Sequence, residues 1–349
     1  MRILMLLSTS YFSGAENVAC QMYNTLTKEE EYEVVYCSPK GDIEQKLKEI
    51  NVAYFPLDKF SVKEVKRAIK EFSPDVIHAH DMRACLLAQL ATKKIPIIGH
   101  IHNNCIGARK FSIRSLLFFF IARKLKHIFW VSKSAFNDYK FRASIESKSE
   151  VLYNVIDLQA IREQADKTSH ADGFDVVYLG RLTYPKNLER LILIVKQLKQ
   201  KLPNVRVAII GNGELYEDVQ KTIVEYNVEK NVKMLGFQKE PYGILKNSKL
   251  LILTSRWEGT PMVVLEALGL GVPVVSTPVD GVVDLIKNGE NGFLSDDNDE
   301  LCREMEKIIL DKDYLNLLSQ NAIKTSNNFN NLEKYKERLV DIYQKVLRQ

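Results

Sequence analysis

The sequence lacks any long hydrophobic run. Among its 349 residues the longest uninterrupted apolar stretch, Leu116–Ala122, has seven residues, whereas a membrane-spanning helix needs about 20. We therefore predict no membrane span. The N-terminal apolar stretch Ile3–Leu7 continues into Ser8 without a small-residue cleavage site. We interpret it as a first β-strand, not a signal peptide, and expect a cytoplasmic protein.

The sequence also lacks paired cysteines. Its five cysteines are scattered, and none forms a Cys-x-x-Cys pair (Cys20, Cys37, Cys85, Cys105 and Cys302). This pattern argues against a disulfide framework and a cysteine-based zinc site, and it indicates a reducing compartment. Histidines occur as His78-Ala-His80 and His100-Ile-His102. We interpret the members of each pair as pointing to opposite faces of a strand, so we expect buried or capping histidines and no metal site.

What the sequence does contain is an alternation of short apolar runs and helical segments. The runs begin with Ile3–Leu7 in the first half and restart with Phe174–Leu179 in the second. Such alternation predicts α/β domains with parallel sheets, whose ligands lie at the carboxyl ends of the strands. The length suits two domains. The charged, small-residue stretch Gln159–Gly173 is interpreted as the linker between them.

Positive charge is concentrated in one region of the first half. Residues 107–148 contain ten Lys and Arg against two Asp and Glu. Within them, 108–126 places basic residues on both sides of an apolar, aromatic core of helical length. This composition is typical of a helix lying on an anionic membrane surface. It equally fits a core helix with a solvated basic edge. Nucleic acid is not expected as a partner, because no binding motif accompanies the charge.

The stretch from Lys249 to Pro273 predicts a strand, a loop and a helix. The helix Met262–Leu270 is apolar except for Glu266, with Thr260 as the expected N-cap and Pro261 as the first helical residue. A helix N-terminus after a strand is suited to binding a phosphate. A lone carboxylate on a buried helix needs hydrogen-bond partners, and ribose hydroxyls would provide them. The alternative is that Glu258 caps its own loop and Glu266 pairs with a buried arginine.

The segment Glu258–Glu266, framed by Glu-Gly-Thr-Pro and Gly-Val-Pro-Val-Val, resembles the E-x7-E signature of the retaining glycosyltransferases of family 4. Bacterial capsular and exopolysaccharide glycosyltransferases are similar. The family has the GT-B fold, an α/β architecture of two facing Rossmann-like domains with parallel sheets and a deep interdomain cleft. The resemblance covers nearly the whole chain. It implies an acceptor-binding domain at 1–165, on which the C-terminal helix at about 330–349 packs back, and a nucleotide-sugar-binding domain at 170–330.

Other segments match family motifs residue by residue. His102 matches the active-site histidine, which with Glu258 contacts the transferred sugar, and Arg181 and Lys186 match the residues that contact the diphosphate. Two positions depart from the pattern: Ser13 and Val155 stand where the family usually has glycine. The resemblance assigns donor binding to the strand-end glycines, a turn beside the base and the E-x7-E helix (Gly14, Gly180, Gly211, Phe237, Gly259, Thr260, Pro261, Met262, Val263 and Glu266).

The resemblance implies a retaining transfer of a hexosyl or N-acetylhexosaminyl group from a nucleotide sugar, most often UDP-linked. The expected acceptor is a saccharide, lipid-linked, in cell-surface polysaccharide or glycoconjugate synthesis, with the protein peripheral on the inner face of the cell membrane. No cofactor and no metal are expected, because the helix dipole and the two cations take the metal's place.

Two alternatives share these motifs. One is a non-catalytic nucleotide-sugar-binding subunit of a membrane glycosylation complex, which the departures at Ser13 and Val155 favour. The other is a nucleotide-sugar epimerase with the same fold, against which Arg181, Lys186 and the two glutamates argue. The segment Val205–Gly213 also resembles a dinucleotide-binding fingerprint, but it lacks the third glycine.

Overall fold

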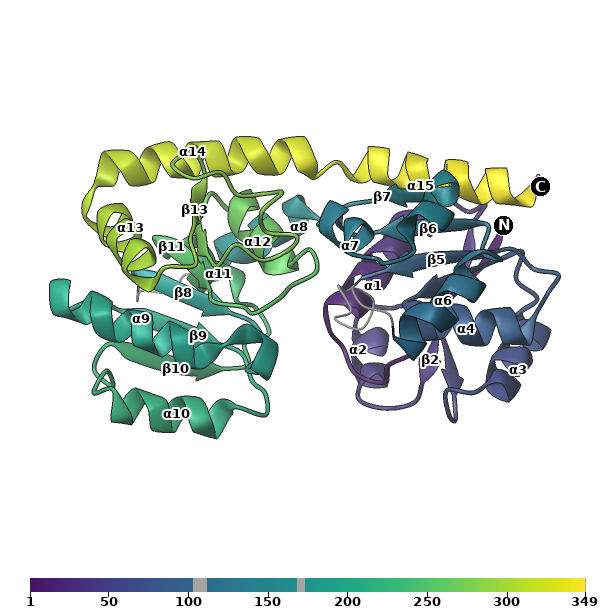
Figure 1. Ribbon diagram of the computed structural model, residues 1–349, viewed down its shortest axis with the longest axis horizontal. Helices are drawn as coiled ribbons and strands as arrows, with labels where there is room; N and C mark the ends of the chain where they lie inside the picture. The colour runs from purple at the N-terminus through teal and green to yellow at the C-terminus, as the bar shows by residue number, and fades with distance from the viewer. Residues whose placement is uncertain (103–111, 168–172, 349) are drawn as a thin grey trace. The chain divides into compact units, whose positions relative to one another are not determined.

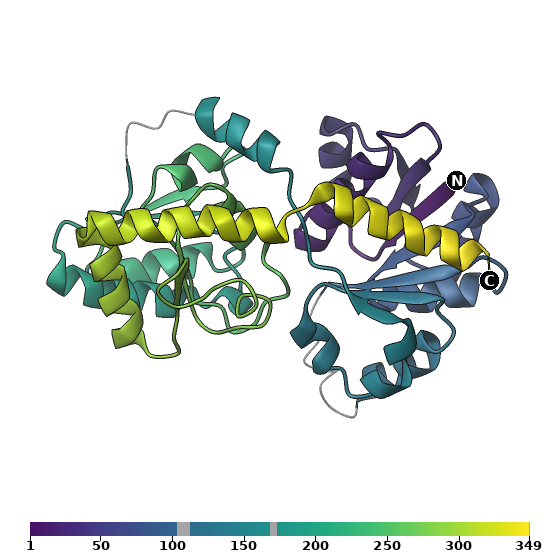
Figure 2. The same cartoon turned by 90° about the horizontal axis from the view of Figure 1, so that it is seen from above.

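The computed structural model describes residues 1–102, 112–167 and 173–348, and the chain forms two compact units. Unit 1 comprises Met1–Val155 and Asn331–Gln349, and unit 2 comprises Ile156–Asn330. Each unit contains one parallel sheet accompanied by helices (Figure 1, and turned by 90° in Figure 2). Parallel neighbours require crossover connections, and the helices supply them. The α/β class and the Rossmann-like character of both units are therefore as the sequence predicts.

The sheet of unit 1 has the strand order β3-β2-β1-β4-β5-β6-β7. Its neighbouring strands are all parallel, and the register places Leu7 beside His80 and His80 beside His100. The order reverses between β1 and β4, which makes the carboxyl ends of these two strands the place where ligands bind in such sheets. The strands are β1 Arg2–Leu7, β2 Glu33–Pro39, β3 Tyr54–Leu57, β4 Val76–His80, β5 Ile97–Ile101, β6 His127–Trp130 and β7 Ser149–Val151.

The C-terminal helix belongs to unit 1. Helix α15 packs against α1, and Lys336 pairs with Glu29 over 2.5 Å. The hydroxyl of Tyr343 also lies 2.7 Å from Nδ1 of His78 in the sheet. These contacts join the two ends of the sequence in one core. The helices of unit 1 are α1 Gly14–Leu26, α2 Ile43–Glu49, α3 Val62–Phe72, α4 Met82–Ala91, α6 Ile113–Ala122, α7 Lys133–Asn137 and α15 Leu332–Leu347.

The sheet of unit 2 has the order β10-β9-β8-β11-β12-β13, again with parallel neighbours. Its order reverses between β8 and β11. The strands are β8 Val176–Leu179, β9 Val207–Ile210, β10 Val232–Gly236, β11 Leu250–Leu253, β12 Val274–Ser276 and β13 Gly292–Leu294. The helices are α8 Leu158–Lys167, α9 Leu188–Lys201, α10 Tyr216–Glu225, α11 Tyr242–Lys246, α12 Met262–Gly269, α13 Asn298–Leu310 and α14 Lys312–Phe329.

The interpretation of Gln159–Gly173 as a linker is wrong for its first part. Residues Leu158–Lys167 form α8, which packs against α11 and α12 within unit 2. Ile161 and Ala165, four residues apart on one helix face, are buried in that packing. Asp157 begins the helix by accepting a hydrogen bond from the N–H of Ala160 at 3.0 Å. The chain passes from one unit to the other at Val155–Ile156, ahead of this helix.

The basic, aromatic segment forms α6 where the structure describes it; residues 108–111 lie outside the described residues. The helix begins after Ser112, which accepts a hydrogen bond from the N–H of Ser115 in a capping box. Phe118, Ile121 and Ala122 are buried in the core of unit 1. On its other side Leu116, Leu117 and Phe120 are about half exposed. No helix among the described residues combines the length and hydropathy needed to span a bilayer.

Candidate active site

The two loops at the strand-order reversal of unit 2 are joined by hydrogen bonds. The hydroxyl of Thr254, just after β11, donates to the carbonyls of Lys186 (3.2 Å) and Asn187 (3.0 Å) in the loop after β8. The N–H of Arg256 donates to the carbonyl of Pro185 at 2.7 Å. Asn187 has φ 54°, a left-handed conformation that asparagine tolerates better than most residues. These contacts fix the position of Lys186 relative to the loop that contains Glu258.

Lys186 and Glu258 form an ion pair. The Nζ of Lys186 lies 2.5 Å from Oε1 of Glu258, and the two side chains are 18% and 10% exposed. The hydroxyl of Ser255 donates to the same carboxylate oxygen at 2.6 Å. Two residues predicted to contact different parts of a donor are thus in direct contact. A largely buried pair of this kind needs good geometry and additional hydrogen bonds to offset desolvation, and Ser255 provides one of them.

Glu266 is buried on α12 and has a tyrosine partner. The hydroxyl of Tyr242, on α11, donates to Oε1 of Glu266 at 3.1 Å, so the alternative of a buried arginine partner is not what the structure shows. Burial raises the pKa of Glu266 to about 7, and the hydrogen bond from Tyr242 acts in the opposite direction. The carboxyl group therefore changes protonation near neutral pH.

The start of α12 differs by one residue from the expectation. Pro261 occupies the N-cap position with φ −72° and ψ 120°, its side chain makes no capping hydrogen bond, and the first helical residue is Met262. Thr260 is therefore not the N-cap residue. Proline favours this extended conformation, which places the helix start directly after it. The peptide N–H groups of the first turn, which includes Met262 and Val263, are the kind of group that binds an anion at a helix N-terminus.

Two glycines, Gly211 among the predicted site residues and Gly281 outside them, allow loops of unit 2 to approach closely. Gly211 has φ 139°, and a Cβ atom there would lie 1.9 Å from the carbonyl oxygen of Gly180. Gly281 has φ 74°, and a Cβ atom there would lie 1.8 Å from the carbonyl oxygen of Gly259. Any side chain at these positions would separate the loops. The glycines therefore bring together the loops after β8 and β9, and those after β11 and β12.

Arg181 and Phe237 lie at the carboxyl ends of β8 and β10. Arg181 is exposed, and its carbonyl accepts a hydrogen bond from the hydroxyl of Tyr178 at 2.9 Å. Phe237 is 74% exposed, directly after Gly236, whose φ is 64°. A large apolar ring so exposed at a strand end offers a surface on which an aromatic base can stack.

Gly14 begins α1 at the corresponding edge of unit 1. A Cβ atom at Gly14 would meet no atom within 4 Å, so the protein's own packing does not require glycine there. Glu16 is buried, and its carboxylate accepts hydrogen bonds from the hydroxyls of Thr9 and Ser13. Neither Ser13 nor Val155 adopts a positive φ. The two departures from the family pattern therefore leave the backbone in conformations open to any residue.

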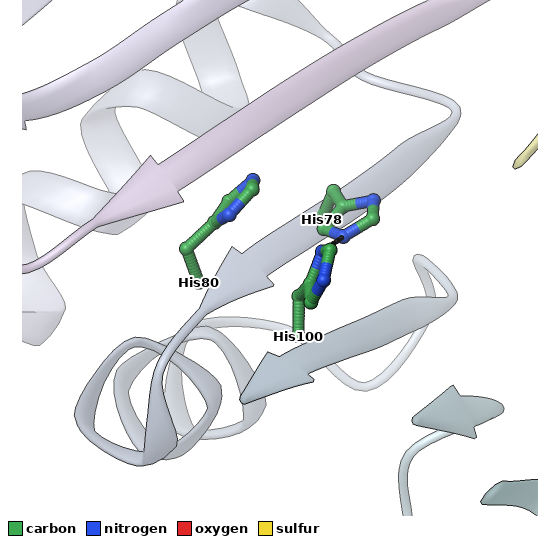
Figure 3. A group of neighbouring side chains, drawn as sticks. All are labelled: His78, His80 and His100. Atoms are coloured by element: carbon green, nitrogen blue, oxygen red, sulfur yellow. Dashed lines mark hydrogen bonds between the residues drawn. The ribbon is translucent and has the colours of Figure 1, made fainter. Parts of the chain in front are cut away.

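The two histidines of β4, His100 of β5 and His102 directly after β5 have their rings on one face of the sheet, so the interpretation that each pair points to opposite faces is wrong. Side chains two residues apart in a strand share a face. The rings of His78 and His80 are stacked with centroids 4.7 Å apart, and those of His100 and His102 with centroids 4.3 Å apart. All four are buried, as expected. Figure 3 shows His78 and His100 side by side on neighbouring strands, with His80 one step further along β4.

Hydrogen bonds join these histidines in pairs across the two strands. Nδ1 of His80 lies 2.8 Å from Nε2 of His102, and Nε2 of His78 lies 3.2 Å from Nδ1 of His100. Burial holds the pKa of His78, His80 and His100 well below the ordinary range and lowers that of His102 to about 3. All four rings are therefore neutral at physiological pH.

Three of these rings form a histidine cluster that the sequence interpretation did not foresee. One nitrogen of each of His78, His80 and His100 lies within 4.8 Å of the others. Neutral imidazoles are good ligands for zinc. However, Nε2 of His78 and Nδ1 of His100 face each other at 3.2 Å, and the rings of His78 and His80 lie 25° from parallel. Lone pairs in stacked rings do not converge on one point, so the arrangement fits paired imidazoles better than a bound ion.

Sequence reasoning missed Tyr242, Ser255 and His80 as partners of the predicted residues. The period-two rule, applied correctly, places His78 and His80 on one face of their strand, and likewise His100 and His102 on one face of theirs. Tyr242 and Ser255 carry no such signal, because the fold alone brings Tyr242 from α11 to α12.

Comparison with known proteins identifies the family. A family model described as "Glycosyl transferases group 1" matches residues 160–325, and one described as "Glycosyltransferase Family 4" matches residues 12–160. The chain belongs to the GT-B glycosyltransferases of the family 4 type. It is therefore a glycosyltransferase that acts on nucleotide-sugar donors, and bacterial capsular and lipopolysaccharide glycosyltransferases are among its relatives.

Two relatives and one solved structure illustrate the likeness. The chain is 24% identical to the UDP-Gal:α-D-GlcNAc-diphosphoundecaprenol α-1,3-galactosyltransferase of Escherichia coli, over 95% of this chain and 93% of that protein. It is 32% identical to an N-acetylgalactosaminyltransferase of Campylobacter jejuni whose name includes a diphospho-undecaprenol acceptor, over 56% of this chain and 53% of that one. The crystal structure of Anabaena HepE with UDP matches the fold with a TM-score of 0.87 at 19% identity, over 99% of this chain and 100% of that one.

Proposed function

We propose that this glycosyltransferase transfers a hexosyl or N-acetylhexosaminyl group from a UDP-sugar to a lipid-linked saccharide, with retention of anomeric configuration, in cell-surface polysaccharide synthesis. The observation that carries the proposal is the grouping of Lys186, Glu258 and the N-terminus of α12 at the strand-order reversal of unit 2. This edge is where parallel α/β sheets bind nucleotides.

Different residues of unit 2 bind different parts of the donor. Lys186, Arg181 and the first peptide N–H groups of α12 bind the diphosphate, while the carboxylate of Glu266 accepts hydrogen bonds from the ribose hydroxyls. Gly180, Gly211 and Gly259 let the loops approach the ligand, and Phe237 stacks on the base. When Lys186 turns toward a phosphate, the carboxylate of Glu258 becomes available to a sugar hydroxyl.

The chemical step breaks the bond between the anomeric carbon and a phosphate oxygen of UDP. A bond forms between the same carbon and an acceptor hydroxyl oxygen, whose proton ends on the departing phosphate. Negative charge grows on that phosphate in the transition state, and Lys186, Arg181 and the dipole of α12 stabilise it. These fixed positive groups take the part that a divalent cation plays in other transferases, so no metal is required.

In unit 1, the residues that we assign to ligand binding are His102 and Gly14. Gly14 leaves space for a phosphate or sugar beside the start of α1, and the neutral ring of His102 makes a hydrogen bond to the transferred sugar.

The names of the relatives support the donor and acceptor classes. The E. coli relative carries UDP-Gal and a diphosphoundecaprenol acceptor in its name, and the C. jejuni relative also carries a diphospho-undecaprenol acceptor. HepE, similar in fold, was crystallised with UDP and with UDP-glucose. On this basis we assign a UDP-sugar donor and an acceptor on a lipid diphosphate carrier.

A lipid-linked acceptor places the protein at the inner surface of the cell membrane, and unit 1 has a surface suited to it. Leu116, Leu117 and Phe120 of α6 are about half exposed. Beside the end of α6 a cavity of about 370 Å³ is lined by basic residues of three segments (Arg123, Lys124, Lys126, Lys148 and Lys345). Apolar side chains together with such positive charge can bind an anionic bilayer. The apolar side chains then enter the membrane interface, and the cations contact the lipid phosphates.

The proposal is tested by supplying purified protein with radiolabelled UDP-galactose, UDP-glucose or UDP-N-acetylglucosamine and an undecaprenyl-diphosphate-linked saccharide. We expect transfer from one of these donors with EDTA present, and the proton coupling constant of the new linkage reports the retained α configuration. Glu258→Gln serves as the inactive control. Nucleotide binding without transfer to any acceptor prepared from membranes would favour the non-catalytic subunit, and release of a free epimerised sugar nucleotide would favour the epimerase.

A further inference from the structure

Two aromatic side chains, Tyr184 and Trp257, form an aromatic pair at the carboxyl edge of the sheet of unit 2. Tyr184 follows β8 and Trp257 follows β11, and their ring centroids lie 5.9 Å apart at an interplanar angle of 56°. Tyr184 is 58% exposed, and Trp257 is partly exposed. The other tryptophan of the chain, Trp130, is buried in the core of unit 1. The aromatic pair therefore presents apolar surface that the core does not use.

Backbone and side-chain contacts hold the aromatic pair in a fixed position. The N–H of Arg256 donates to the carbonyl of Pro185 at 2.7 Å, which joins the residue before Trp257 to the residue after Tyr184. The guanidinium carbon of Arg256 also lies 4.6 Å from the centroid of the Tyr184 ring, in a cation–π contact. Side chains that are already ordered lose little conformational freedom when a ligand binds, so this arrangement favours binding.

The aromatic pair is close in sequence to the ion pair that we assign to the donor. Trp257 directly precedes Glu258, and Tyr184 lies two residues before Lys186, a distance that the chain spans with about 7 Å at most. Nζ of Lys186 and Oε1 of Glu258 are 2.5 Å apart. Helix α12, whose N-terminus we assign to the diphosphate, begins after Glu258. The order along this loop is therefore aromatic ring, sugar-binding carboxylate and diphosphate-binding helix.

The chemistry of the aromatic pair suits a sugar ring. The faces of a pyranose ring carry C–H bonds, and its hydroxyl groups lie around the rim. An aromatic ring packs on such a face, while a tyrosine hydroxyl and a guanidinium group donate hydrogen bonds to the rim. In the proposed reaction the attacking hydroxyl comes within about 3–3.5 Å of the anomeric carbon. The acceptor sugar then lies directly beside the sugar that Glu258 contacts, which is where the aromatic pair can reach it.

We propose that Tyr184 and Trp257 form a stacking subsite for the sugar ring of the acceptor saccharide, with Arg256 holding the ring of Tyr184 and donating to a hydroxyl of that sugar. The inference rests on the proposed function, because it takes Glu258 as the residue that contacts the transferred sugar. It assigns part of acceptor recognition to unit 2, whereas the resemblance assigned the acceptor to residues 1–165. Loops of unit 2 thus bind both substrates of the reaction.

Steady-state kinetics separates this role from donor binding and from stability. With a radiolabelled UDP-sugar and an undecaprenyl-diphosphate-linked saccharide, we expect Trp257→Ala to raise the KM for the acceptor about tenfold while the KM for the UDP-sugar and the melting temperature stay unchanged. Trp257→Phe keeps an aromatic ring and should restore most of the acceptor affinity. Phe237→Ala, which removes another exposed ring of unit 2, is the matched control and should raise the KM for the UDP-sugar alone.

An acceptor KM that is unchanged in both Trp257→Ala and Tyr184→Ala overturns the proposal, and it would favour a partner protein as the ligand of these rings. An equal rise in the KM values of donor and acceptor overturns it as well, because the aromatic pair would then serve the donor.

Tryptophan fluorescence tests the subsite without the reaction. Because Trp130 is buried, a saccharide that stacks on Trp257 changes the emission of Trp257 alone. Titration with methyl α-glucoside, methyl α-galactoside and methyl N-acetyl-α-glucosaminide, with and without UDP, should give a saturable change for at least one of them, and none in Trp257→Phe. No change with any of the three overturns the proposal. A saturable change in a protein that transfers no sugar from any UDP-sugar would contradict the proposed function and leave the saccharide subsite standing.

Discussion

At the scale of single residues, the site of unit 2 contains two acids in different electrostatic states. Glu258 has a cation at 2.5 Å and a hydroxyl at 2.6 Å, whereas Glu266 has a tyrosine hydroxyl as its partner and a pKa raised to about 7. A carboxylate buried without a cation destabilises the fold, and such groups are kept where a ligand needs them. The difference leads to two predictions.

Glu266→Gln should weaken nucleotide binding and stabilise the free protein. Because its folded pKa of about 7 is raised above the ordinary 4.5, the folded state keeps a proton that the unfolded chain releases. The stability of the native protein therefore falls as the pH rises from about 4.5 to 7. At pH 8 the variant should gain about 1–3 kcal/mol in free energy of unfolding, and at pH 4 nearly nothing. Urea unfolding at the two pH values measures this, and an equal gain at both would contradict the burial argument.

The Lys186–Glu258 pair should behave as a unit in stability but not in function. Lys186→Met leaves a largely buried carboxylate without its cation and should cost about 3 kcal/mol. Adding Glu258→Gln removes that charge and should recover most of the loss, while diphosphate binding stays weak because Lys186 is absent. A double-mutant cycle of unfolding free energies, with UDP affinity measured on each variant, tests both statements. Additive stability effects would show that the pair is not coupled.

At the scale of helices and loops, the resemblance assigned roles to segments that the structure places at strand ends, and local physics explains where the structural details differ from the prediction. The predicted start of α12 was one residue too early, with Pro261 as the first helical residue instead of the N-cap. The error arose because the backbone conformation of proline is compatible with either position. The stretch after Asp157 was interpreted as a linker because it is rich in charged residues. Only two of its residues, Ile161 and Ala165, form the buried face of α8. The histidine faces were misassigned although the strand period determines them. Tyr242 and Ser255 could not be predicted, since neither belongs to a motif.

Gly211 is needed for close packing of loops, whereas we assign Gly14 to ligand binding. A pair of variants separates these two roles. Gly211→Ala places a Cβ atom 1.9 Å from the carbonyl oxygen of Gly180 and should destabilise the fold by roughly 2–4 kcal/mol. Gly14→Ala meets no atom within 4 Å and should keep the melting temperature while weakening UDP-sugar binding. Calorimetric melting and titration of both variants check this. Unchanged donor affinity in Gly14→Ala would remove Gly14 from the site.

Helix α6 carries a prediction about the membrane. Phe120→Glu puts a charge on the half-exposed apolar side of the helix and should abolish sedimentation with vesicles of phosphatidylglycerol, because the carboxylate opposes insertion and meets anionic headgroups. Val224→Glu, an exposed apolar residue of α10 in unit 2, is the matched control and should still sediment. Equal binding by both variants, or no binding by the native protein, contradicts the assignment of this surface.

At the scale of the whole molecule, the alternation of strands and helices could be predicted from the sequence, because parallel strands buried on both faces appear there as continuous apolar runs. The two sheets and their strand order then determine where ligands bind, since the reversals at β1/β4 and β8/β11 lie beside Gly14 and Lys186. The identities of the transferred sugar and the acceptor could not be predicted from the sequence. A few loop side chains determine such specificity, and no spacing rule describes them.

The most direct measurement is calorimetric titration of UDP into the native protein and Glu266→Gln, with EDTA present and at pH 6 and 8. We predict one site per chain, no need for a metal, weaker binding to the variant, and tighter binding to the native protein at pH 8 than at pH 6, because the ribose binds the deprotonated Glu266. Binding that requires magnesium, or that is the same for both proteins at both pH values, would contradict the account of this site.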